Sequence, residues 1–312
     1  MFECFVCCRA KQQPGELKNY FIPLRQPFSL SHRDNLYQAH IYMVPVSVVI
    51  ITKNEAEVIA CCINAVKLIT DDIIIVDNYS TDGTPDIARK HGCRVYHENW
   101  NGYGVNKNKG IARAKYNWIL SIDADEIADP ELVGALHEVK LNNASIVYDI
   151  KFISYYGLKP IYFGSWGRDH HVRLFNRKLV KWSESPVHET LMLPKTVTVK
   201  RIKGHLHHYS VKDVAEFTSK ADHYAQLSAG KYLINNKKPT FLKLHIAPIF
   251  HFLKNYIVFF GFLDGREGFM IARMISRHTR LKYRLLKEQP LISAQEQPKV
   301  KDNLVVEYSI ES

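Results

Sequence analysis

The sequence predicts an α/β fold with a mostly parallel, Rossmann-like sheet, followed by an amphipathic helical region. Almost unbroken runs of β-branched residues at 46–51 and 73–77 are typical of strands that are buried on both faces of a parallel sheet. Residues 54–67 between them carry apolar side chains at helical spacing, which completes a strand–helix–strand unit. A third buried run at 117–122 continues the alternation and favours a doubly wound domain.

The intervening elements follow from turn and capping residues. Asp82 and Gly83 form a turn pair, and Thr84 caps a helix that has Pro85 at its first position. A short strand, an Asn- and Gly-rich loop and a further helix are expected at 93–98, 99–106 and 107–115. Beyond residue 145 we expect added strands and loops that wall a cleft, at 145–154, 172–177 and 196–210.

Four regions are expected along the chain. They are an N-terminal extension at 1–42, the α/β domain at 43–210, a helical region at 211–287 and a polar tail at 288–312. Met43 directly precedes the first strong strand, so we expect translation to start there naturally, with 1–42 outside the native protein. The extension lacks the apolar run of a secretory signal, and the clustered cysteines do not form a spaced disulfide framework, so a cytoplasmic location is expected.

The net charge favours anionic partners. The chain has 312 residues, with 42 Lys and Arg against 31 Asp and Glu, which gives +11 at pH 7. Phosphate esters, anionic lipid headgroups and nucleic acid all suit such a charge. A nucleic-acid-binding protein is one alternative, but no recognisable nucleic-acid module is present and acidic residues cluster at the predicted strand ends. We therefore expect no nucleic acid partner.

The apolar stretch 244–263 comes close to membrane-spanning length. Polar and helix-breaking residues interrupt it, so we do not expect a true span; they are His245, Pro248, His251, Lys254 and Asn255. Basic side chains interleaved with Phe, Leu and Ile in this region suit helices that lie in an anionic membrane surface. Packing of these helices on the α/β domain or on a partner subunit is an equal alternative.

An acidic motif follows the third buried strand directly. Asp123 and Asp125 are two positions apart, and Glu126 is next. Carboxylates suit hard cations such as Mg²⁺ or Mn²⁺, which bind through one or two carboxylates plus substrate phosphates. Such a metal would neutralise the charge that develops on a diphosphate leaving group. Further polar residues flank the strands: Thr52, Asn54 and Glu55 after the first, Asp77 and Asp82 after the second, and Lys107 before the third.

Four motifs then stand in order along the chain. They are TKNE at 52–55, VDNYSTDGT at 76–84, KNKG at 107–110 and DADE at 123–126. With these motifs the sequence resembles glycosyltransferase family two. The resemblance implies a GT-A fold and an inverting glycosyltransferase with a nucleotide-sugar donor and a divalent metal.

The resemblance also implies site residues. Thr52 and Asp77 would contact the nucleotide base, Asn54 and Glu55 would belong to the same nucleotide-sugar site, Lys107 would lie near the diphosphate, Asp123 would reach the ribose and Asp125 the metal. Lys107 stands where an arginine is common, and lysine lacks the planar bidentate fork of arginine. Its role at the diphosphate is therefore the less secure assignment.

The second half resembles bacterial lipopolysaccharide-core and lipooligosaccharide beta-1,4-glucosyltransferases. The segments that carry this likeness are VRLFNR, SPVHETL, HYSVKDVAEFTSKADHYA and GFLDGREGF, and the resemblance covers roughly residues 43–285. It implies transfer of a hexose, glucose foremost, from a UDP-sugar to a lipid-linked saccharide acceptor. The enzyme would be peripheral, on the cytoplasmic face of the inner membrane. A polyisoprenyl phosphate or a capsule or exopolysaccharide unit is the alternative acceptor.

Inverting transfer needs a general base that takes the proton of the acceptor hydroxyl. Glu189 is our candidate, since the resemblance places its V-H-E segment near the acceptor. The alternative is that Glu189 only pairs with Arg173 or Lys181, and Asp169 is the rival base.

The histidines at 205, 207 and 208 carry no regular set of metal ligands around them. The resemblance points to His208 as a second metal ligand beside Asp125, and a structural histidine is the alternative. Asp264 and Gly265 are expected to form a helix break or a packing element.

Overall fold

The computed structural model describes residues 7–11, 17–21, 43–184, 189–234 and 237–288. These residues divide into two compact units. One lies within Met1–Lys151 and His170–His207, and the other within Phe152–Asp169 and His208–Ser312. Most of the predicted N-terminal extension and the predicted tail beyond Glu288 are outside the described residues. Within the extension, β1 (Cys7–Lys11) and β2 (Leu17–Phe21) pair antiparallel.

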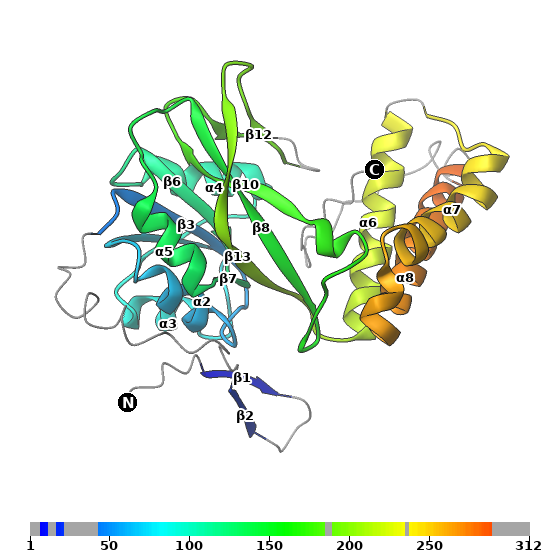
Figure 1. The fold of residues 1–312 in the computed structure, drawn as a ribbon, viewed down its shortest axis with the longest axis horizontal. Helices are drawn as coiled ribbons and strands as arrows, with labels where there is room; N and C mark the ends of the chain where they lie inside the picture. Colours follow the sequence, from blue (N-terminus) through cyan, green and yellow to red (C-terminus); the bar gives the residue numbers. More distant parts are fainter. Residues whose placement is uncertain (1–6, 12–16, 22–42, 185–188, 235–236, 289–312) are drawn as a thin grey trace. The chain divides into compact units, whose positions relative to one another are not determined.

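A nine-stranded sheet organises the first unit (Figure 1). Its order is β5-β4-β3-β6-β10-β8-β13-β7, with β9 paired to β8. The parallel strands are β3 (Val46–Thr52), β4 (Asp72–Asp77), β5 (Arg94–His97) and β6 (Trp118–Asp123). The remaining strands are β7 (Glu126–Ala128), β8 (Ile146–Tyr156), β9 (Lys159–Pro160), β10 (His170–Asn176) and β13 (Thr198–Val211).

The sheet is parallel in one half and antiparallel beyond it, because β10 runs antiparallel to both β6 and β8. All seven residues of β3 are buried, as expected of a central parallel strand. Val49, Val76 and Ile119 meet Phe175 of β10 in one apolar cluster, so the two halves share a core. The predicted α/β class with its parallel sheet is confirmed.

Helices cover the parallel half (Figure 1). They are α2 (Ile59–Val66), α3 (Thr84–Lys90), α4 (Tyr103–Ala112) and α5 (Pro130–Glu138). The prediction that 99–106 is entirely loop is wrong, because α4 already begins at Tyr103. The side chain of Asn106 accepts from the backbone N–H of Asn101 (3.3 Å) and donates to the carbonyl of Asn99 (3.2 Å), which ties the preceding loop to the first helical turn. Two short strands, β11 (Lys181–Trp182) and β12 (Leu191–Met192), form a separate antiparallel pair.

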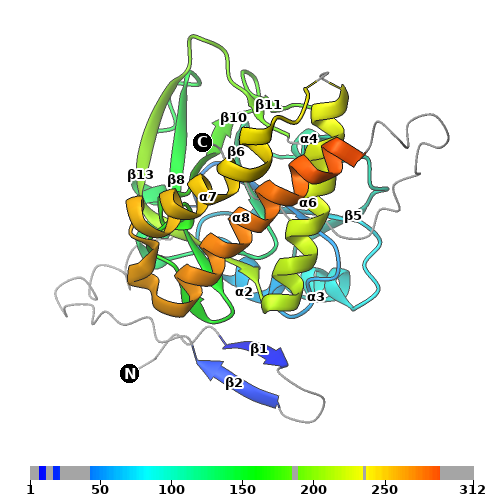
Figure 2. The same cartoon turned by 90° about the vertical axis from the view of Figure 1, so that its right-hand side faces the viewer.

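The second unit is mainly helical, as predicted (Figure 2). Its elements are the short 3₁₀ helix η2 (Trp166–Arg168), α6 (Val214–Ile234), the π-helical η3 (Leu242–Ile246), α7 (Ala247–Leu253), the π-helical η4 (Lys254–Val258), the 3₁₀ helix η5 (Gly261–Asp264) and α8 (Gly265–Glu288). Helices α6, α7 and α8 pack side by side. Phe217 of α6 meets Ile271 and Ile275 of α8 in the core of this unit.

Two buried polar side chains, Asn255 of η4 and Asp264 of η5, form hydrogen bonds with the loop 159–166. The Asp264 carboxylate accepts hydrogen bonds from the backbone N–H groups of Tyr162 (3.2 Å) and Phe163 (2.9 Å). The Asn255 amide donates to the hydroxyl of Ser165 (2.9 Å). Asp264 therefore lies where a helix break was predicted, and its carboxylate holds a loop.

No single helix among the described residues is both long and apolar enough to cross a bilayer. Leu242–Val258 and Gly261–Glu288, which meet at a 71° bend, satisfy the length and composition criteria only as a pair.

Candidate functional site

The carboxyl ends of three neighbouring strands bring the first predicted site residues together. Strands β4, β3 and β6 are adjacent in the sheet and parallel. Thr52 pairs in register with Asp77, and Ile51 pairs with Asp123. Thr52, Asp77 and Asp123 therefore form a row along one edge of the sheet, where ligands of open α/β sheets bind.

Each residue of this row has a buried oxygen that forms no hydrogen bond within the described part of the chain; these atoms are Thr52 Oγ1, Asp77 Oδ1 and Asp123 Oδ1. Asp123 Oδ1 nevertheless has a charged neighbour, because it lies 3.4 Å from Nζ of Lys107. The other oxygen of Asp77 accepts from the backbone N–H of Ser80 and lies 3.0 Å from His97 Nδ1, which fixes the carboxylate. An unsatisfied buried acceptor is costly, so the row is suited to a ligand that presents hydrogen-bond donors.

The side chain of Asn54 connects two loops at this edge. Asn54 has a left-handed backbone (φ 57°), and its amide oxygen accepts from the backbone N–H of Thr81 (2.8 Å). Its own N–H donates to Ser80 Oγ (2.9 Å), and the N–H of Glu55 donates to Thr84 Oγ1 (2.9 Å). These contacts give Asn54 and Glu55 a part in shaping the loops, while their contact with a nucleotide sugar stays a prediction.

The side chain of Asp82 also connects the two loops. Its carboxylate accepts from the N–H of Ala56 (3.0 Å) and from the N–H and hydroxyl of Thr84 (3.1 and 2.5 Å). Burial raises the pKa of Asp82, but these hydrogen bonds outweigh burial, so the pKa lies below its usual value. The carboxylate thus stays charged and holds the two loops together.

Lys107 lies between two carboxylates. Its side chain is 1% exposed, and Nζ lies 3.4 Å from both Asp123 Oδ1 and Glu189 Oε1. The ammonium also lies 4.4 Å from the ring centre of Trp182, a cation–π distance. The predicted diphosphate lysine is therefore in contact with both the predicted base and the predicted ribose ligand.

Arg173 and Glu126 extend this cluster. Arg173 Nη2 lies 2.6 Å from Glu126 Oε1 and 3.5 Å from Asp123 Oδ2, and the arginine side chain is 5% exposed. Glu126 Oε2 accepts from the backbone N–H of Asp123 (3.1 Å). We refer to Glu189, Lys107, Asp123, Arg173 and Glu126 as the buried charge network. Glu126, which had no assigned role, orients Asp123 within it.

The other residues of the KNKG motif and Gly104 set the position of α4. Asn108 donates to the carbonyl of Trp182 (2.9 Å) and accepts from its N–H (3.1 Å), which holds β11 against the helix. A Cβ at Gly110 would lie 2.5 Å from Val49 Cγ1, so only glycine lets α4 pack this closely on β3. At Gly104 a Cβ would lie 1.9 Å from the carbonyl oxygen of Ser183 and 3.2 Å from Glu189 Cβ. The position of the candidate base thus depends on this glycine.

Asp125 lies on the two-residue turn that joins β6 to β7 and is half-buried. Arg173 and Trp182 are the members of the site that sequence reasoning did not assign. The sequence indicates Arg173 only as an alternative partner for Glu189. A signal was present for Arg173, since an arginine inside a buried strand needs a carboxylate partner.

Comparisons with known proteins identify the family of the chain. The family model described as Glycosyl transferase family 2 matches residues 47–193. An uncharacterized glycosyltransferase of Rickettsia prowazekii (strain Madrid E) is 31% identical over 270 residues, which cover 81% of this chain and 91% of the relative. The chain belongs to glycosyl transferase family 2. It is therefore a glycosyltransferase.

Two further similarities differ in extent. The lipopolysaccharide core biosynthesis glycosyltransferase LpsC of Rhizobium meliloti (strain 1021) is 28% identical to this glycosyltransferase over 73% of the chain and 87% of the relative. Glucosyl-3-phosphoglycerate synthase from Mycobacterium tuberculosis, solved with Mn²⁺, UDP and its product, is 27% identical over 36% of this chain and 43% of that one. The TM-score of that match is 0.30, so no structural detail is transferred from it.

Two predicted site residues of the glycosyltransferase belong to the second unit. His208 is buried, and its ring meets Phe152 edge-on with ring centres 6.0 Å apart. Asp169 follows η2, and its carbonyl accepts from the N–H of Phe152 (2.9 Å). Metal binding by His208 and the rival base role of Asp169 stay predictions.

The other two histidines of the HLHH run lie beside a carboxylate. His205 Nδ1 lies 3.0 Å and His207 Nε2 3.8 Å from Asp129 Oδ2, and Asp129 also caps α5 by accepting from the N–H of Leu132 (2.7 Å). Asp129, Glu131 and His205 have ligand atoms within 4.8 Å of one another. The expectation that no ligand set accompanies these histidines is wrong for His205. The position of the Asp129 carboxylate in this group is explained by its role as the N-cap of α5.

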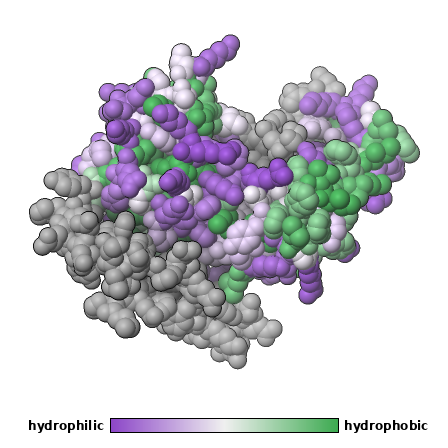
Figure 3. Space-filling view, in the orientation of Figure 1, coloured by the Kyte–Doolittle hydropathy of each residue, from purple (hydrophilic) through white to green (hydrophobic). Residues whose placement is uncertain are grey.

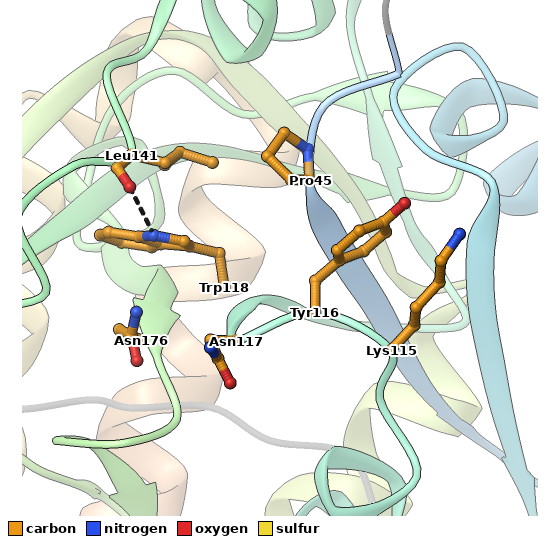
Figure 4. A pocket seen from close by; sticks show the side chains of 7 residues that line it. All are labelled: Pro45, Lys115, Tyr116, Asn117, Trp118, Leu141 and Asn176. Atoms are coloured by element: carbon orange, nitrogen blue, oxygen red, sulfur yellow. Dashed lines mark hydrogen bonds between the residues drawn. The ribbon is translucent and has the colours of Figure 1, made fainter.

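A surface cavity of about 380 Å³ lies at the opposite edge of the sheet (Figure 4). Pro45, Tyr116 and Trp118 line it, and Trp118 Nε1 donates to the carbonyl of Leu141 (2.9 Å). These residues lie at the amino ends of β3 and β6, whereas Thr52 and Asp123 are at the carboxyl ends. This cavity is therefore not the candidate active site of the glycosyltransferase.

Proposed function

We propose that the protein is an inverting enzyme that transfers a hexose, glucose foremost, from a UDP-sugar to a lipid-linked saccharide acceptor in lipopolysaccharide or lipooligosaccharide core biosynthesis. The similarity to LpsC supports the core pathway. The single observation that supports the donor is the pair of buried, unsatisfied oxygens on Thr52 and Asp77, in one row with Asp123.

A nucleoside diphosphate matches this row through its hydrogen-bond donors. Uracil presents an N–H between two carbonyls, and ribose presents two hydroxyls. The Asp77 carboxylate only accepts hydrogen bonds, whereas the Thr52 hydroxyl both donates and accepts. We assign Thr52 and Asp77 to the base and Asp123 to the ribose.

Asp125 suits a divalent cation, because it places a half-buried carboxylate on the turn directly after the ribose-binding acid. Mg²⁺ and Mn²⁺ both favour carboxylate oxygens. We propose that Asp125 holds one of these ions. When bound, the ion would neutralise the negative charge on the departing diphosphate.

Glu189 is the proposed general base. It takes the proton of the acceptor hydroxyl while that oxygen bonds to the anomeric carbon of the sugar. The bond from this carbon to the diphosphate oxygen breaks, and UDP leaves with the electron pair. The configuration inverts because the acceptor oxygen attacks the face opposite the departing diphosphate. Lys107 acts on Glu189 by pairing with its carboxylate, and the Trp182 ring packs against the ammonium of this lysine.

The test is transfer by the purified protein with Mn²⁺, a panel of UDP-sugars and a lipid-linked core acceptor. Glu189→Gln should lower kcat by about 10²–10⁴-fold, with UDP binding measured by calorimetry unchanged. Glu184→Gln, on an exposed carboxylate of the same segment, is the matched control and should keep full activity. Asp125→Ala should lose metal-dependent transfer, and undiminished activity in this variant would remove Asp125 from the metal site.

The acceptor class is tested in the same assay. We propose that the enzyme works on the cytoplasmic face of the inner membrane, where a core saccharide, a polyisoprenyl phosphate and a capsule repeat unit are all lipid-linked acceptors. Transfer to a polyisoprenyl phosphate or a capsule unit in place of the core would leave the proposed glycosyl transfer standing. It would contradict the proposed role in core biosynthesis.

A further inference from the structure

A helix of the second unit is apolar on both of its faces. Residues Leu242–Val258 form one helical run composed of η3, α7 and η4. On its inner face Leu244 and Ala247 pack against Ala229, Tyr283 and Leu286. A helix at the surface of a soluble domain normally carries polar residues on the other side.

The outer face of this helix is apolar as well. Large apolar residues recur there at helical spacing, and their exposed fractions lie between 44% and 62%; they are Leu242, Ile246, Ile249, Phe250, Leu253 and Ile257. Of the 23 large hydrophobic residues that are exposed in the described chain, 12 lie between Phe241 and Phe269. Figure 3 shows the resulting hydrophobic area over the α7 region, bordered by hydrophilic residues. Contiguous exposed apolar patches of this kind mark interaction sites.

The charges around this face are almost all positive. Residues 237–288 contain eleven Lys and Arg against three Asp and Glu, which supplies +8 of the net +11 of the chain. Between 237 and 266 the one acidic residue is Asp264, and it is buried and hydrogen-bonded to backbone N–H groups. Exposed basic residues stand at both ends of this segment, with Lys237, Lys238 and Lys243 at one end and Arg266 at the other.

We propose that this apolar face inserts into the surface of an anionic lipid bilayer, with the surrounding lysines and arginines at the headgroups. Apolar side chains bordered by basic ones suit this partner, because the lipid tails take up the former and the anionic headgroups attract the latter. A protein partner of opposite charge would be an alternative occupant only if it also presented a large apolar surface. We refer to the exposed apolar residues of 241–269 as the lipid face.

The lipid face is continuous with the loop that carries Tyr162 and Phe163. Both residues are exposed, at 58% and 36%, and both give their backbone N–H to Asp264, directly after the lipid-face residue Leu263. The loop 159–166, which lies in the region predicted to wall a cleft, is thus anchored to the element that contacts lipid. This arrangement suits an acceptor that is itself held in the bilayer.

Flotation of the full chain with vesicles tests this proposal. Vesicles of phosphatidylcholine with phosphatidylglycerol should carry the protein upward, and vesicles of phosphatidylcholine alone should carry much less. Ile249→Glu with Phe250→Glu should lower partitioning by about tenfold or more per side chain, because the transfer of each apolar group is lost. Lys243→Glu should lower binding to the anionic vesicles alone, by about fivefold or more.

Two control variants test whether any exposed apolar residue would have the same effect on flotation. Leu68→Glu and Val199→Glu change equally exposed residues of the first unit, at 53% and 52%, and should float like the wild type. Thermal unfolding verifies that each variant is folded. UDP binding, measured without lipid, reports separately on the donor site and should not change in any of them.

Three results would overturn the proposal. In the first, the wild-type protein stays at the bottom of the gradient and does not float with anionic vesicles. In the second, the Ile249 and Phe250 double variant floats as well as the wild type. Alternatively, sedimentation without lipid would show a dimer that only this double variant breaks, which would assign the lipid face to a second copy of the chain.

Discussion

Nζ of Lys107 lies 3.4 Å from Oε1 of Glu189, and the two side chains are only 1% and 2% exposed. A lysine on α4 is thus held next to the candidate base by the fold itself. Because the same ammonium also meets Asp123, one cation neutralises two carboxylates that have separate proposed tasks.

Lys107→Met should destabilise the fold by about 3–5 kcal/mol, because it leaves Glu189 buried without its counter-ion. Urea unfolding measures this loss. Lys109→Met is the matched control on the same helix, since Lys109 pairs with Glu98 at a more exposed position (30% and 18%). That variant should lose less than about 1 kcal/mol. Equal losses in the two variants would contradict a special role of the buried pair.

Gly104→Ala should lower kcat with little change in UDP binding. The added methyl group would meet the carbonyl of Ser183 and press on Glu189, so the base would move from its position. Steady-state kinetics and calorimetry of UDP binding separate the two effects. Gly134→Ala in α5 has open space around its new methyl group and should be neutral or stabilising by up to about 1 kcal/mol. Full activity of Gly104→Ala would show that the segment 183–189 adapts.

Asp129→Ala should destabilise the first unit by about 0.5–2 kcal/mol, because α5 loses its N-cap. Asp129→Asn keeps a capping oxygen and removes only the charge. Burial raises the pKa of Asp129, but hydrogen bonds from His207, the N–H of Leu132 and His205 outweigh it, and the net pKa is lowered.

The sign of that shift sets a pH dependence. A carboxylate with a lowered pKa in the folded state stabilises the fold above the unfolded value of about 3.9, and the stabilisation disappears as the pH falls through the folded value. The stability difference between wild type and Asp129→Asn should therefore be constant around neutral pH and shrink in acid. A difference that grows as the pH falls would contradict this assignment.

Cys62 should resist thiol reagents in the folded protein. Burial raises the pKa of this thiol well above its usual value, and the nearby Glu126, Asp125 and Asp123 raise it further. The reactive thiolate is therefore scarce and inaccessible. Iodoacetamide labelling followed by mass spectrometry should modify Cys62 in urea and not in buffer. Rapid modification in buffer would show that the region behind the acidic motif opens.

The row of strand-end residues in this site can be predicted from local sequence. Buried β-branched runs predict parallel strands, and the carboxyl ends of parallel strands share an edge, so the meeting of Thr52, Asp77 and Asp123 follows from the pattern alone. The helical C-terminal region follows from composition and periodicity in the same way.

The buried charge network cannot be predicted from local sequence. Lys107 and Glu189 are 82 residues apart, and Arg173 is 47 residues from Glu126. No local period predicts which cation meets which carboxylate, so the motif around Lys107 implies a role at the diphosphate and does not reveal its two acidic neighbours. The start of α4 was misplaced for a related reason, since the Asn and Gly content of 99–106 is typical of a loop and the side-chain bonds of Asn106 are not visible in composition.

The anchoring of loop 159–166 has a consequence for making chimeras with other family members. Asn255 and Asp264 supply the hydrogen bonds that shape this loop, although they follow it by about a hundred residues. A graft of the loop alone would lose those bonds and place new side chains on a backbone that lacks two of its side-chain anchors. We therefore expect that a chimera made to change acceptor preference through this loop must carry 159–166 and 255–264 together.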